Sequence, residues 1–136
     1  MARQSLKSRM ENRIQRSRRN IFLRRDFERA GGYDQVGRAM RTLVADGKLM
    51  KIGYGLYAKT RPNRLTGRPM LVAEGGFTEV AQEALNRLGI KWVPAKLFKA
   101  YQDGATQIPA NAAVIVTDRF NRKIETDRFK LQIAKS

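Results

Sequence analysis

The sequence predicts an α+β fold, and three observations lead to that prediction. The chain has 136 residues, of which 42% are hydrophobic, enough for a core and too many for wholesale disorder. Apolar residues recur with helical spacing over residues 36–44, and two short strand patterns joined by glycines follow at once. The second half mixes helical periods with alternating and continuous apolar runs.

The first 32 residues predict two helices with a short strand between them. Residues 5–17 carry one apolar stripe made of Leu6, Met10 and Ile14, and the Ser5 hydroxyl is suited to cap that helix. The apolar run at residues 20–23 predicts a small strand. Asp26 is then expected to cap a short helix over residues 27–30, which the glycines at 31 and 32 end.

The next helix is the clearest element of the chain. Its apolar face follows the spacing i, i+3, i+4, i+7, i+8, at Val36, Ala39, Met40, Leu43 and Val44. Asp34 suits the positive end of the helix dipole, and Gly47 lies where a left-handed C-cap is expected. The opposite face is predicted to carry Gln35, Gly37, Arg38, Arg41, Thr42 and Ala45.

A hairpin follows directly, with predicted strands over residues 48–52 and 56–59. Gly53 and Gly55 are expected to supply the positive φ angles of its turn, and Tyr54 lies at the tip. Residues 61–70 contain two of the four prolines and a glycine, which predicts a linker between a domain at 1–60 and an α+β domain at 71–136.

The second half is expected to begin with a helix over residues 77–88, capped by Thr78. Pro94 should open a further helix with Leu97, Phe98 and Tyr101 inward. Strands are predicted around residues 106–108, 112–117, 122–125 and 128–134. The near-continuous apolar run at 113–116 predicts a central strand.

The charge points to a polyanionic partner. Lys and Arg number 28 against 12 Asp and Glu, for a formal net charge of +16, and neutralising phosphates releases counterions. DNA, RNA and an anionic membrane surface fit that charge. No apolar run is long enough to cross a bilayer, and the first residues lack a signal peptide, so a cytoplasmic protein without a membrane partner is expected.

The residue types leave little room for catalysis. Cysteine and histidine are both absent, which excludes disulfides, Cys/His zinc sites and Cys-His or Ser-His-Asp nucleophiles. A Mg²⁺-dependent nuclease built on carboxylates stays open as an alternative, with Glu79 and Glu83 sharing a helical face. Two solvated surface carboxylates are the simpler interpretation. We therefore expect no enzyme, no cofactor and no metal site.

A helix followed at once by a two-stranded hairpin in a basic chain is typical of a winged helix-turn-helix, which binds duplex DNA. The residues expected to touch base edges lie on the exposed helix face, at Gln35, Arg38, Arg41 and Thr42. Gly37 is explained if a phosphate strand approaches the helix closely. The residues expected to hold the DNA backbone or minor groove are Arg24, Arg25, Lys48, Lys51 and Tyr54.

The stretch GGYDQVGRAMRTLVADGKLMKIGYGLYAK resembles AbiEi-type antitoxins and related winged-helix regulators of toxin–antitoxin modules. The shared pattern is a helix, a basic strand and a G-x-G-x-Y wing, and the ATQIP and RFNRKIE segments extend it through most of the chain. The resemblance implies repression of the protein's own promoter through an inverted-repeat operator. It also implies a homodimer, or a second half that helps to neutralise a cognate toxin.

The alternative is a basic RNA-binding or ribosome-associated protein. Single-stranded RNA is bound by aromatic side chains displayed on an open sheet. Here most phenylalanines fit core patterns, at Phe22, Phe27, Phe77, Phe98 and Phe129, and the aromatic residues expected to be free are Tyr33, Tyr54 and Phe120. The aromatic pattern therefore favours duplex DNA over RNA.

Overall fold

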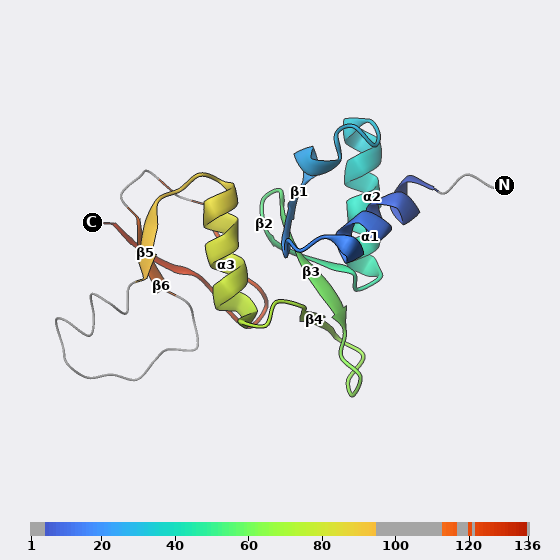
Figure 1. Ribbon diagram of the computed structural model, residues 1–136. Coiled ribbons are helices and arrows are strands. Elements are labelled where there is room, and N and C mark those ends of the chain that lie inside the picture. Colours follow the sequence, from blue (N-terminus) through green and yellow to red (C-terminus); the bar gives the residue numbers. More distant parts are fainter. Residues whose placement is uncertain (1–4, 95–112, 117–119, 121, 136) are drawn as a thin grey trace.

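The computed structural model describes residues 5–94, 113–116, 120 and 122–135, and these residues form a mixed α+β fold (Figure 1). Three α-helices and two β-sheets make up the described part, which confirms that the fold belongs to the mixed α+β class. The predicted strand at 106–108 and the side chains of Leu97, Phe98 and Tyr101 lie outside the described residues.

The N-terminal third follows the predicted order of elements. Helix α1 spans Leu6–Arg16, and the Ser5 hydroxyl accepts a hydrogen bond from the N–H of Ser8 at 3.1 Å, as the cap prediction requires. Strand β1 spans Ile21–Leu23 and helix α2 spans Tyr33–Ala45. Gly47 ends α2 with a φ of 77°, so the left-handed cap is confirmed.

The predicted helix at 27–30 is wrong in position and type. A 3₁₀ helix, η1, spans Arg24–Phe27 instead, and residues 28–30 form turns. The Asp26 carboxylate accepts a hydrogen bond from the N–H of Leu23 at 2.8 Å, so it satisfies the start of η1 from inside the turn. Asp26 is therefore a capping residue, as predicted, but it caps the 3₁₀ helix that contains it rather than a helix that follows it.

Strand β3 of the hairpin is the centre of the first sheet. Strand β2 spans Leu49–Gly53 and β3 spans Leu56–Pro62, and β1 pairs with the other side of β3 to give the antiparallel order β1-β3-β2. The far end of β3 pairs with β4, Pro69–Leu71. Residues 61–70, predicted to be a linker, therefore form a hairpin, in which the Asn63 side chain accepts hydrogen bonds from Leu65 and Thr66.

The second half contains helix α3 (Gly76–Arg87) and a three-stranded sheet. Its strands are β5 (Trp92–Pro94), β6 (Ala113–Val116) and β7 (Gln132–Lys135). Strand β6 is central, as predicted; it pairs antiparallel with β5 and parallel with β7. Two expectations are wrong: α3 is capped by Gly75 rather than Thr78, and residues 122–125 form only the isolated bridge from Glu125 to Lys130. Pro94 is the last residue of β5, and the helix predicted to follow it lies outside the described residues.

The sheet of β1, β2 and β3 is buried on both faces. Successive side chains along a strand point to opposite sides, so each strand contributes to two different clusters. On one face, Phe22 and Leu49 join a cluster with α1 and α2. On the other face lie Ile21, Leu23, Ile52, Leu56 and Ala58, which pack with side chains of α3 and β6. This arrangement explains why all three residues of β1 are buried.

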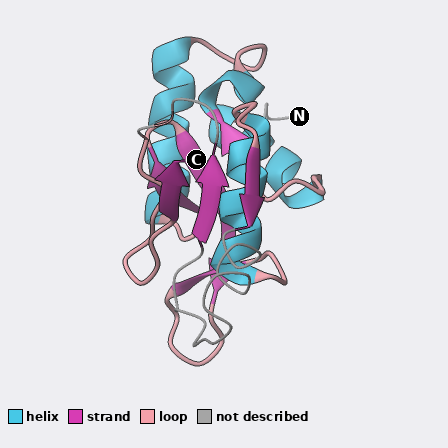
Figure 2. Cartoon of the chain, turned by 90° about the vertical axis from the view of Figure 1, so that its left-hand side faces the viewer, coloured by secondary structure: helices cyan, strands magenta, loops and turns pink. Residues whose placement is uncertain are grey.

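Helix α3 lies between the two sheets (Figure 1), and Figure 2 looks onto β5, β6 and β7 with the helical layers behind them. Its buried side chains, among them Phe77, Val80 and Leu85, belong to the same cluster as β1–β3 and β6. The two halves of the described chain therefore share one core. No helix among the described residues is long and apolar enough to span a bilayer.

Carboxylates tie β1 and η1 to α3. Glu83 Oε2 accepts hydrogen bonds from the N–H groups of Asn20 and Ile21, at 2.8 and 2.7 Å, and so covers the free edge of β1. Asp26 forms an ion pair with Arg87 in which both side chains are largely buried. Glu79 accepts a hydrogen bond from the N–H of Gly75 at 3.1 Å. Both glutamates thus bind backbone N–H groups, but Glu83 is half-buried whereas Glu79 is exposed, as the simpler interpretation of that residue predicted.

Two cations fix α1 to its neighbours. The Lys59 ammonium donates to the carbonyls of Gln15 and Ser17, at 3.3 and 2.9 Å, where the negative end of the α1 dipole lies. Lys7 forms a 2.5 Å ion pair with Asp46 beyond the end of α2. The hydrogen bond to Asp46 raises the pKa of Lys7, so on the alkaline side the ion pair is lost only as the pH rises through that raised value.

We expect Glu83→Ala to destabilise the fold by about 2 kcal/mol, because two N–H groups of the β1 edge lose a charged acceptor. The free energy of unfolding from urea titration would measure this. The matched control is Glu74→Ala, since Glu74 is an exposed carboxylate before α3; it should change stability by less than about 0.5 kcal/mol. Equal effects of the two substitutions would contradict the role given to Glu83.

Candidate nucleic-acid interface

The face of α2 that points away from the core presents the four residues predicted to read bases. Its buried side is made of Val36, Ala39, Met40 and Leu43, among others. The residues on the exposed side are Gln35, Arg38, Arg41 and Thr42. The structure therefore places all four together, on one solvent-facing surface about two turns long.

Two of these side chains already have partners within α2. Gln35 Oε1 accepts a hydrogen bond of 3.4 Å from the N–H of Gly32, which caps the helix. The Thr42 hydroxyl donates to the carbonyl of Arg38 at 3.1 Å. The Gln35 amide nitrogen and the Thr42 lone pairs stay available for a ligand, because neither bond uses them.

Arg38 and Arg41 are exposed and lack an acidic partner among the described residues. The two ion pairs in the described part of the chain join Lys7 to Asp46 and Arg87 to Asp26. The carboxylate that follows α2 is therefore occupied by α1 rather than by these arginines. Two guanidinium groups on one helix face that form no ion pair with a described acid attract anions.

Gly37 does not lie on the exposed face of α2, where it was predicted. The residue is buried, and a Cβ atom there would collide with the guanidinium of Arg24. That guanidinium lies over the ring of Tyr33, 3.7 Å from its centroid. The glycine is thus explained by the close approach of Arg24 to α2, and the predicted approach of a phosphate strand is not needed to explain it.

Arg24 consequently lies beside the first turns of α2 rather than reaching freely into solvent. Its Nε atom is buried and has no hydrogen-bond partner among the described residues. The N-terminal end of a helix is itself positive, so a guanidinium there increases the local positive potential. The Arg24–Tyr33 pair makes this end of α2 attractive to a phosphate group.

The hairpin tip is supported by the second half of the chain. Gly55 has a φ of 68°, as predicted, but Gly53 does not have a positive φ. A Cβ atom on Gly53 would lie 2.6 Å from the carbonyl oxygen of Lys123. The guanidinium of Arg122 donates to the carbonyl of Tyr54, and the N–H of Glu125 donates to the carbonyl of Ile52 at 2.7 Å.

This contact adds two basic residues that the sequence did not single out for the site. Arg122 and Lys123 lie next to the hairpin tip, where the Tyr54 side chain is 80% exposed. The only sequence signal was Gly53, the first glycine of Gly53-Tyr54-Gly55, because the turn needs a positive φ only at Gly55.

The other residues predicted to hold the DNA backbone, Lys51, Lys48 and Arg25, lie in three different parts of the structure. Lys51 is exposed and lies two residues from Leu49, on the face of β2 that α2 covers. Lys48 lies at the opposite end of β2 from the tip, in a hollow with Gln15 and Thr60. Arg25 donates to the carbonyl of Arg87, at 3.3 Å, at the end of α3. The structure therefore does not bring Lys48 and Arg25 to the hairpin tip.

The exposed aromatic residues agree with the sequence in two of three cases. The side chains of Tyr33 and Tyr54 are 68% and 80% exposed, but Phe120 is buried in the core shared by the two halves. The described residues contain no group of three carboxylates that could hold a metal ion.

Arg24 and Gly37 should behave as an energetically coupled pair. Gly37→Ala gains about 1 kcal/mol of helix propensity but displaces Arg24 from Tyr33, so its net stabilisation in the wild-type chain should be small. In an Arg24→Ala background the full gain should appear. Urea unfolding of the four variants measures this coupling. The same gain in both backgrounds would mean that Arg24 does not occupy the space beside Gly37.

Comparisons of the chain with protein-family models, with curated proteins and with solved structures gave no match.

Proposed function

We propose that this protein is a sequence-specific regulator that binds duplex DNA through α2 and the β2–β3 hairpin. The observation that carries the proposal is the exposed face of α2, where Gln35, Arg38, Arg41 and Thr42 have free hydrogen-bonding groups and the two arginines lack ion-pair partners among the described residues. An α-helix fits the major groove of B-DNA, and such side chains suit base edges.

The order of elements supports a winged helix-turn-helix. Helix α1, the turn η1 and α2 are followed by β2 and β3, with β1 against the outer side of β3. In that arrangement α2 is the recognition helix and the hairpin is the wing. The shared burial of β2 and α2 holds the hairpin in a fixed position relative to the helix, which a two-part DNA surface requires.

Different residues would serve base reading and backbone binding. Arg38 and Arg41 suit guanine, since a guanidinium can donate to both O6 and N7. Arg24 beside the start of α2 and Lys51 and Tyr54 on the hairpin suit phosphates or the minor groove. The tip-contacting residues Arg122 and Lys123 extend that backbone surface.

The resemblance to AbiEi-type antitoxins supports a narrower proposal of the same kind. The regulator would repress its own promoter as a homodimer on an inverted repeat, because two-fold symmetry in the protein matches a palindromic operator. A cognate toxin would be the partner of the second half. The protein would act without catalysis, and no step in this function needs a cofactor.

The competing function is RNA binding or association with the ribosome. Duplex DNA is favoured because the strands β1–β3, which lie beside α2, are covered on both faces, so bases cannot stack on this sheet. The 80% exposed Tyr54 and the 68% exposed Tyr33 lie on a hairpin tip and a helix start instead.

The choice between DNA and RNA can be tested by competition at physiological salt. We expect duplex DNA to displace a bound fluorescent duplex at concentrations at least about tenfold lower than structured RNA of equal length. The logarithm of the DNA association constant should fall linearly with the logarithm of the salt concentration, since phosphate contacts release counterions. Tighter binding of the RNA would contradict the proposed function.

Arg38→Ala should cost about 1–3 kcal/mol on a duplex selected for tight binding and much less on a scrambled duplex. The control is Arg64→Ala, since Arg64 is an exposed arginine on the β3–β4 turn, outside α2 and the β2–β3 hairpin. Fluorescence anisotropy on both duplexes measures the two affinities. Equal losses on selected and scrambled DNA would reduce Arg38 to a phosphate contact and remove the base-reading assignment.

A further inference from the structure

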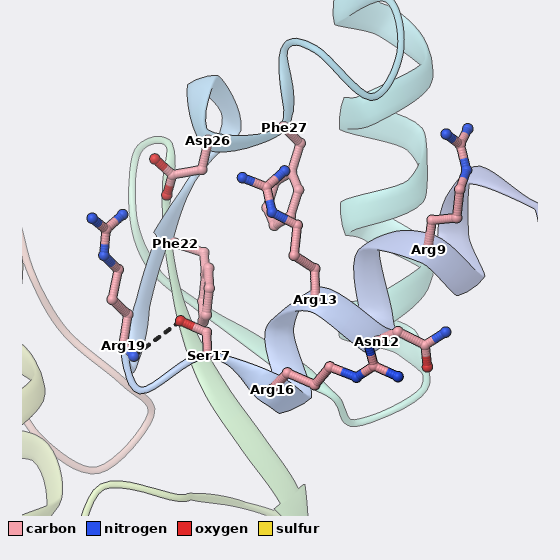
Figure 3. A pocket seen from close by; sticks show the side chains of 9 residues that line it. All are labelled: Arg9, Asn12, Arg13, Arg16, Ser17, Arg19, Phe22, Asp26 and Phe27. Atoms are coloured by element: carbon pink, nitrogen blue, oxygen red, sulfur yellow. Dashed lines mark hydrogen bonds between the residues drawn. The ribbon is translucent and has the colours of Figure 1, made fainter.

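A second basic surface surrounds a cavity between α1, β1 and η1. The cavity has a volume of about 690 Å³, and its lining includes Arg9, Arg13, Arg16 and Arg19 together with Phe22 and Phe27 (Figure 3). No residue of α2, β2 or β3 lines it. The cavity is therefore separate from the surface proposed to bind DNA.

The four arginines follow from the sequence of α1. Positions 9, 13 and 16 have the spacing i, i+4, i+7, so their side chains lie on one face of the helix, and Arg19 follows in the loop before β1. In Figure 3, Arg13 and Arg19 are drawn on either side of the Phe22 ring. The Arg13 guanidinium lies 5.2 Å from the centroid of Phe27, and Arg9 donates to the carbonyl of Ala30 at 3.4 Å.

The positive charge of the cavity is not cancelled within the described part of the chain. The acidic residue in its wall is Asp26, whose carboxylate pairs with Arg87 and accepts the N–H of Leu23. None of the four arginines forms an ion pair with a described acid. Four guanidinium groups around one hollow repel each other, and an anion with several charges would relieve that repulsion.

The shape of the cavity decides between kinds of anion. Its volume lies within the range of about 300–1,000 Å³ that is usual for small-molecule sites. Phe22 and Phe27 are only 4% and 1% exposed, so the floor offers little apolar surface. Protein interfaces are anchored by apolar or aromatic side chains at their centre, and this hollow has no such accessible anchor. Small, highly charged ligands fit it better than a protein segment.

We propose that this cavity binds a compact ligand with several phosphate groups. A guanidinium group offers a planar fork of donors that pairs with two phosphate oxygens, and arginines at neighbouring positions can hold adjacent phosphates. A nucleoside triphosphate and a short inorganic polyphosphate share this chemistry. The site does not depend on the proposed DNA binding, since it uses different residues on a different surface.

Isothermal titration calorimetry of the full chain with inorganic tripolyphosphate, at about 150 mM salt, tests the proposal. The variant is Arg13→Gln/Arg16→Gln. Its matched control is Arg18→Gln/Arg64→Gln, which removes the same charge from exposed positions outside the cavity. We expect the cavity variant to weaken binding at least about tenfold, because charge-assisted hydrogen bonds are lost, and the control to weaken it less than about threefold.

Equal weakening by the two double variants would overturn the proposal, since it would mean a general attraction of the +16 chain for anions. Tighter binding of a glutamate-rich peptide than of tripolyphosphate, abolished by Arg13→Gln/Arg16→Gln, would overturn the phosphate assignment in favour of a protein partner. Titration with ATP distinguishes the two kinds of phosphate ligand. An affinity for ATP higher than that for tripolyphosphate identifies a nucleotide, and a similar affinity identifies a polyphosphate chain. Circular dichroism melts of all variants establish that each is folded.

Discussion

The structure depends on a small sheet that is buried on both faces. Because β1, β2 and β3 send alternate side chains into two different clusters, the same three strands support α1 and α2 on one side and α3 with β6 on the other. The position of the hairpin relative to α2 is fixed by this double burial rather than by the turn. Carboxylates reinforce it where the sheet ends, since Glu83 covers the β1 edge and Asp26 joins η1 to α3.

The same constraint shapes the charges of the surface. Acidic residues are used to join elements: Asp46 holds Lys7, Asp26 holds Arg87, and Glu83 holds the backbone of β1. The arginines of α1 and α2 form no ion pair with a described acid, and two positive surfaces result. One lies along α2 and the other around the cavity beside α1. The excess positive charge is thus concentrated on two surfaces. A general attraction for polyanions would not require such a concentration.

The spacing of apolar residues predicted those elements that depend only on residues close together in the sequence. The spacing from Val36 to Val44 gave α2 and its exposed face, and the apolar run at 113–116 gave a central strand. Contacts between residues distant in sequence could not be predicted. The space beside Gly37 is filled by Arg24, thirteen positions earlier, and the neighbour of Gly53 is Lys123. A glycine in the sequence shows that space is needed but not which group occupies it. For the same reason the 3₁₀ turn at Arg24–Phe27 was placed too late.

The most direct test of the central claim is a titration of the isotope-labelled chain with a short duplex, followed by NMR of its backbone amides. If α2 and the hairpin bind DNA, the largest chemical-shift changes should fall at residues 34–42 and 51–55, with smaller changes at 122–123. Residues 9–19 around the cavity should change little, since they lie on a different surface. Changes centred on residues 9–19, with α2 and the hairpin unaffected, would contradict the account.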